Sequence, residues 1–215
     1  MPSGKTLLII LFILGLLWTL WSWYVTRGLE KPSYSIVAEG AGYEIREYES
    51  YIVAETTVSN EDYWESLNEG FVPVADYIFG NNTSSTKISM TVPVLRDSSP
   101  DGEKIDMTTP VLREAGQGAS TTVAFVMPSE YTMETLPTPN NEAVRLREVP
   151  ARKVAVRTFF WFASAERIEE QTGKLRSAVT ADGYTYKDGE LFAAYNPPGT
   201  VPFLRQYEVM VELTN

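Results

Sequence analysis

The motif KISMTVPVL at residues 87–95 returns 17 residues later as KIDMTTPVL at residues 104–112. In both copies apolar and polar residues alternate with period two, the pattern of a strand that turns one face toward a core. Residues 97–102 between the copies are rich in turn-forming residues, which favours a hairpin of two antiparallel strands. The shared face is predicted to hold Ile88, Met90, Val92 and Val94 in one copy and Ile105, Met107, Thr109 and Val111 in the other.

The methionines of this motif have two interpretations. Met is a flexible side chain that fills gaps in a core, and its thioether is also a soft metal ligand. We favour packing for Met90 and Met107 and expect no protein-bound metal centre.

Composition limits the classes of function. The chain has 215 residues, of which 44% are hydrophobic and 12% aromatic, enough for one domain with a sizeable core. Residues 32–215 hold 15 of the 18 Lys and Arg but 27 of the 28 Asp and Glu, a net charge of −12. Such an acidic domain argues against nucleic acid as a partner, because phosphate binding needs a basic surface.

Histidine and cysteine are both absent from the sequence. Their absence excludes disulfides, zinc sites built from Cys or His, nucleophilic Ser-His and Cys-His pairs, and haem ligated by His. Carboxylates, with Lys and Tyr as weaker alternatives, are the acid-base groups that remain for an enzyme.

The N-terminal segment is predicted to cross a membrane. Residues 6–25 carry no charge, and 20 helical residues span about 30 Å, the thickness of a hydrocarbon core. Trp18, Trp21, Trp23 and Tyr24 cluster at its C-terminal end, as in an aromatic belt. A cleaved signal peptide is the alternative. We favour an uncleaved anchor over residues 1–27, because no small-x-small cleavage site follows the apolar run.

Residues 28–42 are interpreted as a juxtamembrane tether because they are rich in Gly and Pro. Basic residues balance on the two flanks of the apolar run, so the positive-inside rule does not decide the orientation. The very short N-terminal tail favours a single-pass protein whose C-terminal domain is extracytoplasmic.

The remaining chain, residues 43–215, is internally duplicated. The strand-like runs 43–48 and 51–58 reappear about 101 residues later as 144–149 and 152–159, which aligns Arg46 with Arg147. A helical pattern follows in each half: residues 63–79, which Gly70 and Pro73 are expected to split into two short helices, and a helix capped by Ser164 that runs to about residue 181.

Two strands are expected after each helix, the doubled motif in the first half and residues 190–195 and 205–213 in the second, with a strand at 121–127 joining the halves. The halves, about 43–112 and 143–213, each read β-β-α-β-β. The fold class predicted is α+β, with a curved antiparallel sheet or distorted barrel on which two helical segments pack, preceded by one transmembrane helix.

Five landmarks in order resemble the SOUL haem-binding protein family. They are the doubled KIxMTxPV, GFxP at 70–73 leading into YIFG at 77–80, LPxPN at 136–140, LREVPAR at 146–152, and PFLR at 202–205 followed by EV at 208–209. The resemblance covers nearly all of residues 43–213. It implies a tandem β-α-β-β type fold and a shallow apolar groove for haem or another tetrapyrrole.

The groove that the resemblance implies is expected on the first helical segment and the doubled motif. Its candidate residues are Tyr63, Leu67, Phe71, Val74, Tyr77, Lys87, Met90 and Met107. Lys87 or Arg96 is near enough in sequence to meet carboxylates of the ligand. In one branch of the family His is the proposed axial ligand, and this chain departs from that pattern, so ligation falls to Met or Tyr or is absent. Ordinary packing of helix on sheet is the alternative for every apolar member.

The predicted function is therefore a membrane-tethered carrier, buffer or sensor of a tetrapyrrole, with micromolar or weaker affinity and no His-type spectrum. Binding of another small amphiphile, or an enzyme using Glu47, Glu55 or Glu148, is the alternative, provided that one of these carboxylates points inward with a raised pKa. Residues 159–162 are four consecutive aromatics, FFWF. They cannot all face one core, so one or two are expected to line a groove or the membrane-proximal surface.

Overall fold

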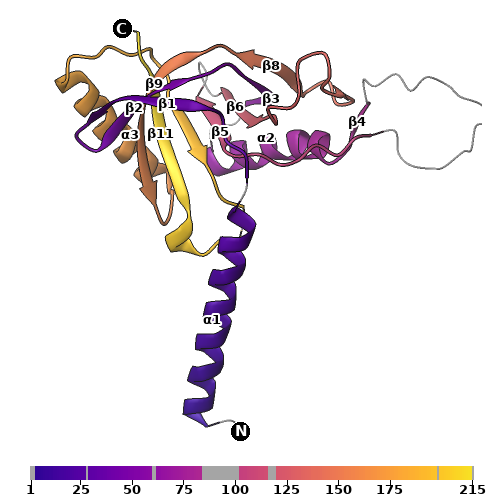
Figure 1. Cartoon of the computed structure of the whole chain (residues 1–215), viewed down its shortest axis with the longest axis vertical. Helices are drawn as coiled ribbons and strands as arrows, with labels where there is room; N and C mark the ends of the chain where they lie inside the picture. Colours follow the sequence, from indigo (N-terminus) through magenta and orange to yellow (C-terminus); the bar gives the residue numbers. More distant parts are fainter. Residues whose placement is uncertain are drawn as a thin grey trace, which may run out of the picture.

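The computed structural model describes residues 3–27, 29–59, 62–83, 102–115, 120–197 and 199–214. Helix α1 (Gly4–Thr26) projects from the rest of the chain as a stalk (Figure 1). Its apolar side chains are exposed almost throughout. Among the described residues α1 alone is long and apolar enough to cross a membrane, a criterion that a signal sequence also meets.

Nine antiparallel strands form one curled sheet, in the order β1-β2-β9-β11-β10-β5-β6-β3-β8. With the helices packed on it, the domain is of the α+β class, as predicted. The strands of this sheet are β1 (Tyr34–Gly40), β2 (Tyr43–Tyr48), β3 (Tyr51–Ser59), β5 (Val111–Ala115), β6 (Ser120–Val126), β8 (Arg145–Val149), β9 (Arg152–Phe160), β10 (Leu191–Ala194) and β11 (Gln206–Glu212). A separate two-stranded ribbon pairs β4 (Asn82–Thr83) with β7 (Thr138–Pro139).

The sheet shows the internal duplication directly. Strands β10 and β5 pair at its centre, and the order on one side (β11, β9, β2) matches the order on the other (β6, β3, β8). The first strand of each half pairs with the second strand of the other half, so Arg46 lies opposite Val154 and Arg147 lies opposite Val53. The two halves therefore exchange their first strands, and neither half completes its own part of the sheet.

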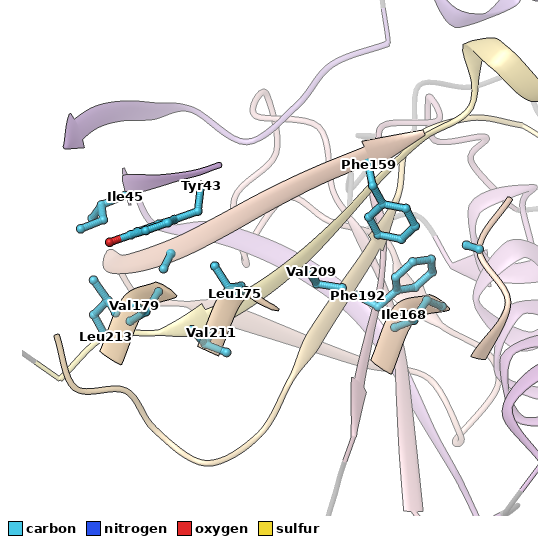
Figure 2. Close-up of a cluster of buried hydrophobic side chains, with 12 residues drawn as sticks. Tyr43, Ile45, Phe159, Ile168, Leu175, Val179, Phe192, Val209, Val211 and Leu213 are labelled. Carbon is cyan, nitrogen blue, oxygen red and sulfur yellow. The ribbon is translucent and has the colours of Figure 1, made fainter. Parts of the chain in front are cut away.

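One helix from each half covers the same face of the sheet. Helix α2 (Tyr63–Ile78) packs on β3 and β6, and α3 (Ala165–Ala181) packs on β9 and β11. The Ser164 side chain caps α3 by accepting a hydrogen bond from the Arg167 N–H at 3.2 Å, as predicted. Figure 2 shows Ile168, Leu175 and Val179 of α3 in the buried cluster with the strand residues Val209 and Val211.

The doubled motif differs from the prediction in its second copy, residues 104–112. Its first copy lies outside the described residues, and in the second copy only the last two residues belong to a strand, β5, which pairs with β6 and β10. The predicted period-two face is also wrong, because Ile105 and Thr109 are buried while Met107 is 40% exposed. The reason is tertiary: the N–H of Ile105 bonds the Ile78 carbonyl at the end of α2, and that of Thr109 bonds the Glu30 carbonyl, both at 2.9 Å.

Helix α2 is continuous, although two short helices were predicted. Pro73 removes one helical hydrogen-bond donor, but packing on the sheet outweighs that loss. Gly70 lets the helix approach closely, since a Cβ atom there would lie 2.5 Å from Cγ2 of Val123 on β6.

Two boundaries also differ from the prediction. The strand expected to join the halves is β6, the last strand of the first repeat, so that repeat extends to Val126 rather than to residue 112. Part of the predicted tether, Tyr34–Gly40, is strand β1, which pairs with β2 and adds an edge that the second repeat does not have. Three residues, Pro202–Leu204, form the short 3-10 helix η1 before β11.

Candidate functional site

The predicted residues on α2 belong mainly to the core beneath the helix. Val74 is fully buried and Tyr77 is 1% exposed, whereas Leu67 and Phe71 are partly buried and pack against the same cluster. The Phe71 ring lies 5.1 Å from that of Phe125. Tyr63 is the first residue of α2, and Lys87 and Met90 lie outside the described residues.

Tyr77 is poorly suited to ligate iron. Its hydroxyl donates a hydrogen bond to the Pro137 carbonyl at 2.9 Å. Burial raises the pKa of Tyr77 well above its usual value, which disfavours the phenolate that a metal would need. The side chain therefore acts as a core residue of the α2 layer.

A hollow of about 340 Å³ lies at the base of the domain, where the chain leaves α1. Three segments surround it: residues 30–33 after α1, the β2–β3 turn at 49–52, and the loop that follows β6, at 126–129 and 131–134. Thr108 and Glu148 complete the lining. A second, more open depression of about 650 Å³ adjoins it, shares Glu30 and Thr108, and is lined by Met107. Both volumes are within the range of small-molecule sites, about 300–1,000 Å³.

Hydrogen bonds between the three segments hold this hollow in shape. The carboxylate of Glu30 accepts from the Ser129 N–H at 2.8 Å, and the Glu30 carbonyl accepts from the Thr109 N–H. The Met127 N–H donates to the Ile52 carbonyl at 2.8 Å. The first residues after α1 are therefore part of the wall rather than a free linker.

The lining combines soft and aromatic side chains with carboxylates. Tyr51, Ile52, Met127, Tyr131 and Met133 supply apolar surface, and Met133 is 41% exposed. Tyr131 donates to Glu103 at 2.9 Å; burial, with that hydrogen bond, raises the pKa of Tyr131 to about 12. The charged residues that line the smaller hollow are Glu30, Glu49, Glu134 and Glu148 against Lys31.

The sheet face opposite the helices is filled by side chains. A cluster of Tyr48, Val154, Tyr195 and Met210 leaves a space of about 20 Å³ there, too small for a ligand. The charged centre of this face is the ion pair between Arg46 and Glu208, whose side chains are 5% and 1% exposed and approach to 3.0 Å.

Further hydrogen bonds satisfy the buried Glu208 carboxylate. The Tyr195 hydroxyl donates to it at 2.6 Å, and Thr158 and Gln206 each donate at 3.2 Å. Burial, followed by the neighbouring carboxylate, raises the pKa of Tyr195 far above its usual value. The Glu208 side chain is therefore fully engaged within the protein, and the network is interpreted as structural.

The three carboxylates proposed for an enzyme offer no free buried base. Glu47 and Glu148 are exposed, and Glu55 accepts two hydrogen bonds from Arg147 at 2.7 and 3.0 Å. None of the three therefore has the inward-pointing, unpaired side chain that the enzyme alternative needs.

Of the residues that line the two hollows, the sequence analysis named Met107 and did not name Tyr51, Met127, Tyr131 or Met133. No local pattern joins them, because Tyr51 and Met133 are 82 residues apart in the chain. Glu208 left a weak signal, since it lies between the apolar residues Tyr207 and Val209 of a strand-like run, whereas Arg46 stands beside Glu47 and left none.

Comparisons with known proteins agree with this architecture. Residues 29–103 and 96–212 match the family model described as SOUL heme-binding protein. The chain is 29% identical over 182 residues to heme-binding protein 2 of Homo sapiens, covering 80% of each chain. It is 26% identical over 171 residues to heme-binding protein 1 of Xenopus laevis, covering 80% of this chain and 83% of that protein.

Solved structures with a similar fold include the C-terminal domain of EcmrR, with a TM-score of 0.56 at 10% identity over 85% of this chain and 98% of that one. A hydrolase from Listeria innocua gives a TM-score of 0.54 at 11% identity, over 83% and 94% of the two chains. At such identities the likeness concerns the fold alone.

Proposed function

Because this chain belongs to the SOUL heme-binding protein family, we propose that it is a membrane-anchored protein that binds haem or another tetrapyrrole without a His ligand. The observation that carries the proposal is the family match over residues 29–103 and 96–212, since it spans both repeats and includes the segments that wall the hollow. The two relatives whose names describe them as heme-binding each align with 80% of this chain.

The hollow at the base is the position that we propose for the macrocycle. It offers flat and soft surface from Tyr51, Tyr131 and Met133, with Met107 on the adjoining depression. The exposed thioethers of Met107 and Met133 are the groups that could reach an iron atom, since Tyr77 is buried in the α2 core. Bound haem would bring its iron and its planar hydrophobic ring to this surface.

Charge determines how a tetrapyrrole would sit. Four carboxylates and one lysine line the smaller hollow, so the propionates of a porphyrin are repelled from its interior and would face solvent. This repulsion, together with the lack of an imidazole ligand, accounts for the weak affinity that we propose, micromolar or weaker.

The outer edge of α2 remains a second position for the ligand. Leu67 and Phe71 are partly buried there, so a flat molecule could contact both, with Val74 and Tyr77 supporting them from the core. Tyr63, Lys87 and Met90 belong to the same proposed wall.

We propose α1 as an uncleaved anchor that crosses the membrane once and leaves the domain on the extracytoplasmic side. Its 23 residues correspond to about 34 Å of helix, more than a hydrocarbon core of about 30 Å.

The test is a titration of the full chain in lipid nanodiscs with haemin and with metal-free protoporphyrin, followed by absorbance against empty nanodiscs. We expect saturable one-to-one binding of both, which strengthens as salt rises because screening weakens the repulsion of the propionates. Met133→Ala should change the haemin spectrum and leave protoporphyrin binding in place. Val72→Ala, on the exposed side of α2, is the matched control.

Two outcomes decide between the positions and against the proposal. Leu67→Ala weakening both ligands while Met133→Ala changes neither would place the macrocycle on α2. A lack of saturation with both ligands would contradict tetrapyrrole binding. It would favour the alternative, in which the hollow binds a different small amphiphile.

A further inference from the structure

Four exposed aromatic side chains gather where β9 ends and β11 begins. Phe160, Trp161, Phe162 and Phe203 are between 48% and 55% exposed, and we call them the aromatic edge. Their segments meet because the Trp161 N–H donates to the Arg205 carbonyl at 3.3 Å. Large aromatics together on a surface indicate an interaction site rather than core packing.

The backbone of the aromatic edge has an unfavourable conformation at one residue, Trp161. Trp161 has φ +85°, a conformation that favours glycine, and it follows directly after Phe159 and Phe160, which alternate between core and surface. The Trp161 and Phe203 rings meet edge to face at 6.4 Å, and the Arg205 guanidinium lies 5.8 Å from the Phe162 ring. Strained backbone at an exposed tryptophan indicates a function for its exposure.

The same end of the domain lies against the side of α1. The Trp18 indole N–H donates to the Gly199 carbonyl at 2.7 Å, and the Val201 N–H donates to the Ser22 hydroxyl at 3.0 Å. Ser22 is fully buried by this contact. In Figure 1 the yellow segment before β11 lies beside the upper turns of α1.

These contacts fix the depth of the segment along α1. Trp18 lies eight residues before the end of α1, which is about 12 Å along the helix axis. If α1 spans a bilayer, its four-residue aromatic belt marks the boundary between lipid and water. The segment hydrogen-bonded to Trp18 and Ser22 is then at the depth of that boundary, and η1 with Phe203 follows it directly.

We propose that the aromatic edge inserts into the interfacial layer of the phospholipid bilayer beside α1, as a second membrane contact that fixes the orientation of the domain. The proposal rests on the proposed membrane anchor. The lipid it fits is one with zwitterionic headgroups, because residues 32–215 carry a net charge of −12 and anionic lipid would repel them. Tryptophan and phenylalanine at headgroup depth supply apolar contact without needing that charge.

The absence of cysteine from the chain allows a direct test. Single variants of the full chain, Phe162→Cys, Phe203→Cys, Leu11→Cys and Asp188→Cys, are labelled with an NBD fluorophore and reconstituted in phosphatidylcholine vesicles. Leu11 is in the middle of α1, and Asp188 is exposed beside Glu212, at the end of β11 away from Gln206. Quenching by lipids spin-labelled at a shallow or a deep acyl position is then measured.

We expect shallow quenchers to reduce fluorescence at 162 and 203 at least twofold, deep quenchers to act at 11, and neither to act at 188. If 162 and 203 behave like 188 while 11 is quenched, the anchor stands and the aromatic edge does not contact lipid. If the label at position 11 is not quenched, the proposed membrane anchor is contradicted, and the inference that depends on it is contradicted as well.

A second variant separates membrane contact from folding. Trp161→Gly relieves the unfavourable φ and removes a ring, so the protein should unfold at a higher temperature while quenching at 162 decreases. The label at Phe162→Cys is also measured in a chain that carries Phe160→Ser, Trp161→Ser and Phe203→Ser. Quenching that is unchanged by these three substitutions would overturn the proposal.

Discussion

The two repeats place equivalent arginines in opposite environments. Arg46 on β2 is 5% exposed and pairs with the buried Glu208, whereas Arg147 on β8 is 44% exposed and pairs with Glu55. The register is the same, since each arginine lies opposite the equivalent valine of the other half. One difference is β1, which pairs with β2 and places the Tyr34 ring 4.5 Å from the Arg46 guanidinium, while β8 remains an edge strand. The other is the partner carboxylate, because Glu208 lies on β11 whereas Glu55 lies on β3, at the position equivalent to Val156.

The largest effect is expected from Glu208→Ala. It leaves Arg46 charged, buried and without its main partner, which should destabilise the fold by about 3–5 kcal/mol. Glu55→Ala is the matched change in the exposed pair and should cost about 0–1 kcal/mol. Both are measured by denaturant unfolding of the full chain in detergent. Equal costs would show that the exposed and buried pairs do not differ in energy.

Alkaline pH should weaken the buried network around Arg46 and Glu208. Burial raises the pKa of Tyr48, beside Arg46, to about 12, and a group with a raised folded-state pKa stabilises below its unfolded value of 10. That contribution is lost as pH rises from 10 to 12 and amounts to about 2–3 kcal/mol. Tyr48→Phe should reduce this loss of stability by that amount and leave the part that comes from other buried tyrosines such as Tyr195; the equivalent position of the second repeat, Val149, cannot titrate. An unchanged pH profile in Tyr48→Phe would assign the loss to other tyrosines.

Glycines in the two helices should respond with opposite sign. Gly70→Ala in α2 drives a methyl group against Val123 and should cost about 1–3 kcal/mol. Gly173→Ala in α3 meets no atom within 4 Å and should stabilise by about 0.5–1 kcal/mol through better helix propensity. Thermal unfolding of the two variants measures both changes. A stabilised Gly70→Ala would mean that α2 can move away from the sheet.

The smallest effect tests β1 itself. Tyr34→Ala removes the ring over Arg46 and should cost about 1 kcal/mol, the scale of one cation–π contact. Val37→Ala on the same strand controls for strand propensity, because Val37 is exposed and lies at the bulge of β1, where it is not paired with Arg46. The comparison is made by denaturant unfolding, and equal costs would remove the cation–π contact from the explanation.

Much of the first-order architecture could be predicted because its signals are local. The cap at Ser164 and the apolar stripe containing Ile168 and Leu175 indicated α3 almost to the residue. The strands near 43–48, 51–58, 121–127 and 152–159 were found by alternation, and the doubled landmarks indicated the family that the comparisons confirm. The second copy of the doubled motif was wrongly predicted to be a strand over its whole length, because the N–H groups of Ile105 and Thr109 bond to α2 and to Glu30 instead of to a neighbouring strand.

The sequence by itself determined the apolar length of α1, the alternating strands, the α3 helix and the absence of any His or Cys ligand. These depend on residue type and on spacing within one segment. Only the tertiary structure decided which strands are exchanged, that Arg46 is buried while Arg147 is not, and that Tyr51, Met133 and Glu30 wall one hollow. The physical reason is that burial and electrostatic environment are set by neighbours distant in the chain, and the sheet pairing that supplies those neighbours leaves no local periodic signal.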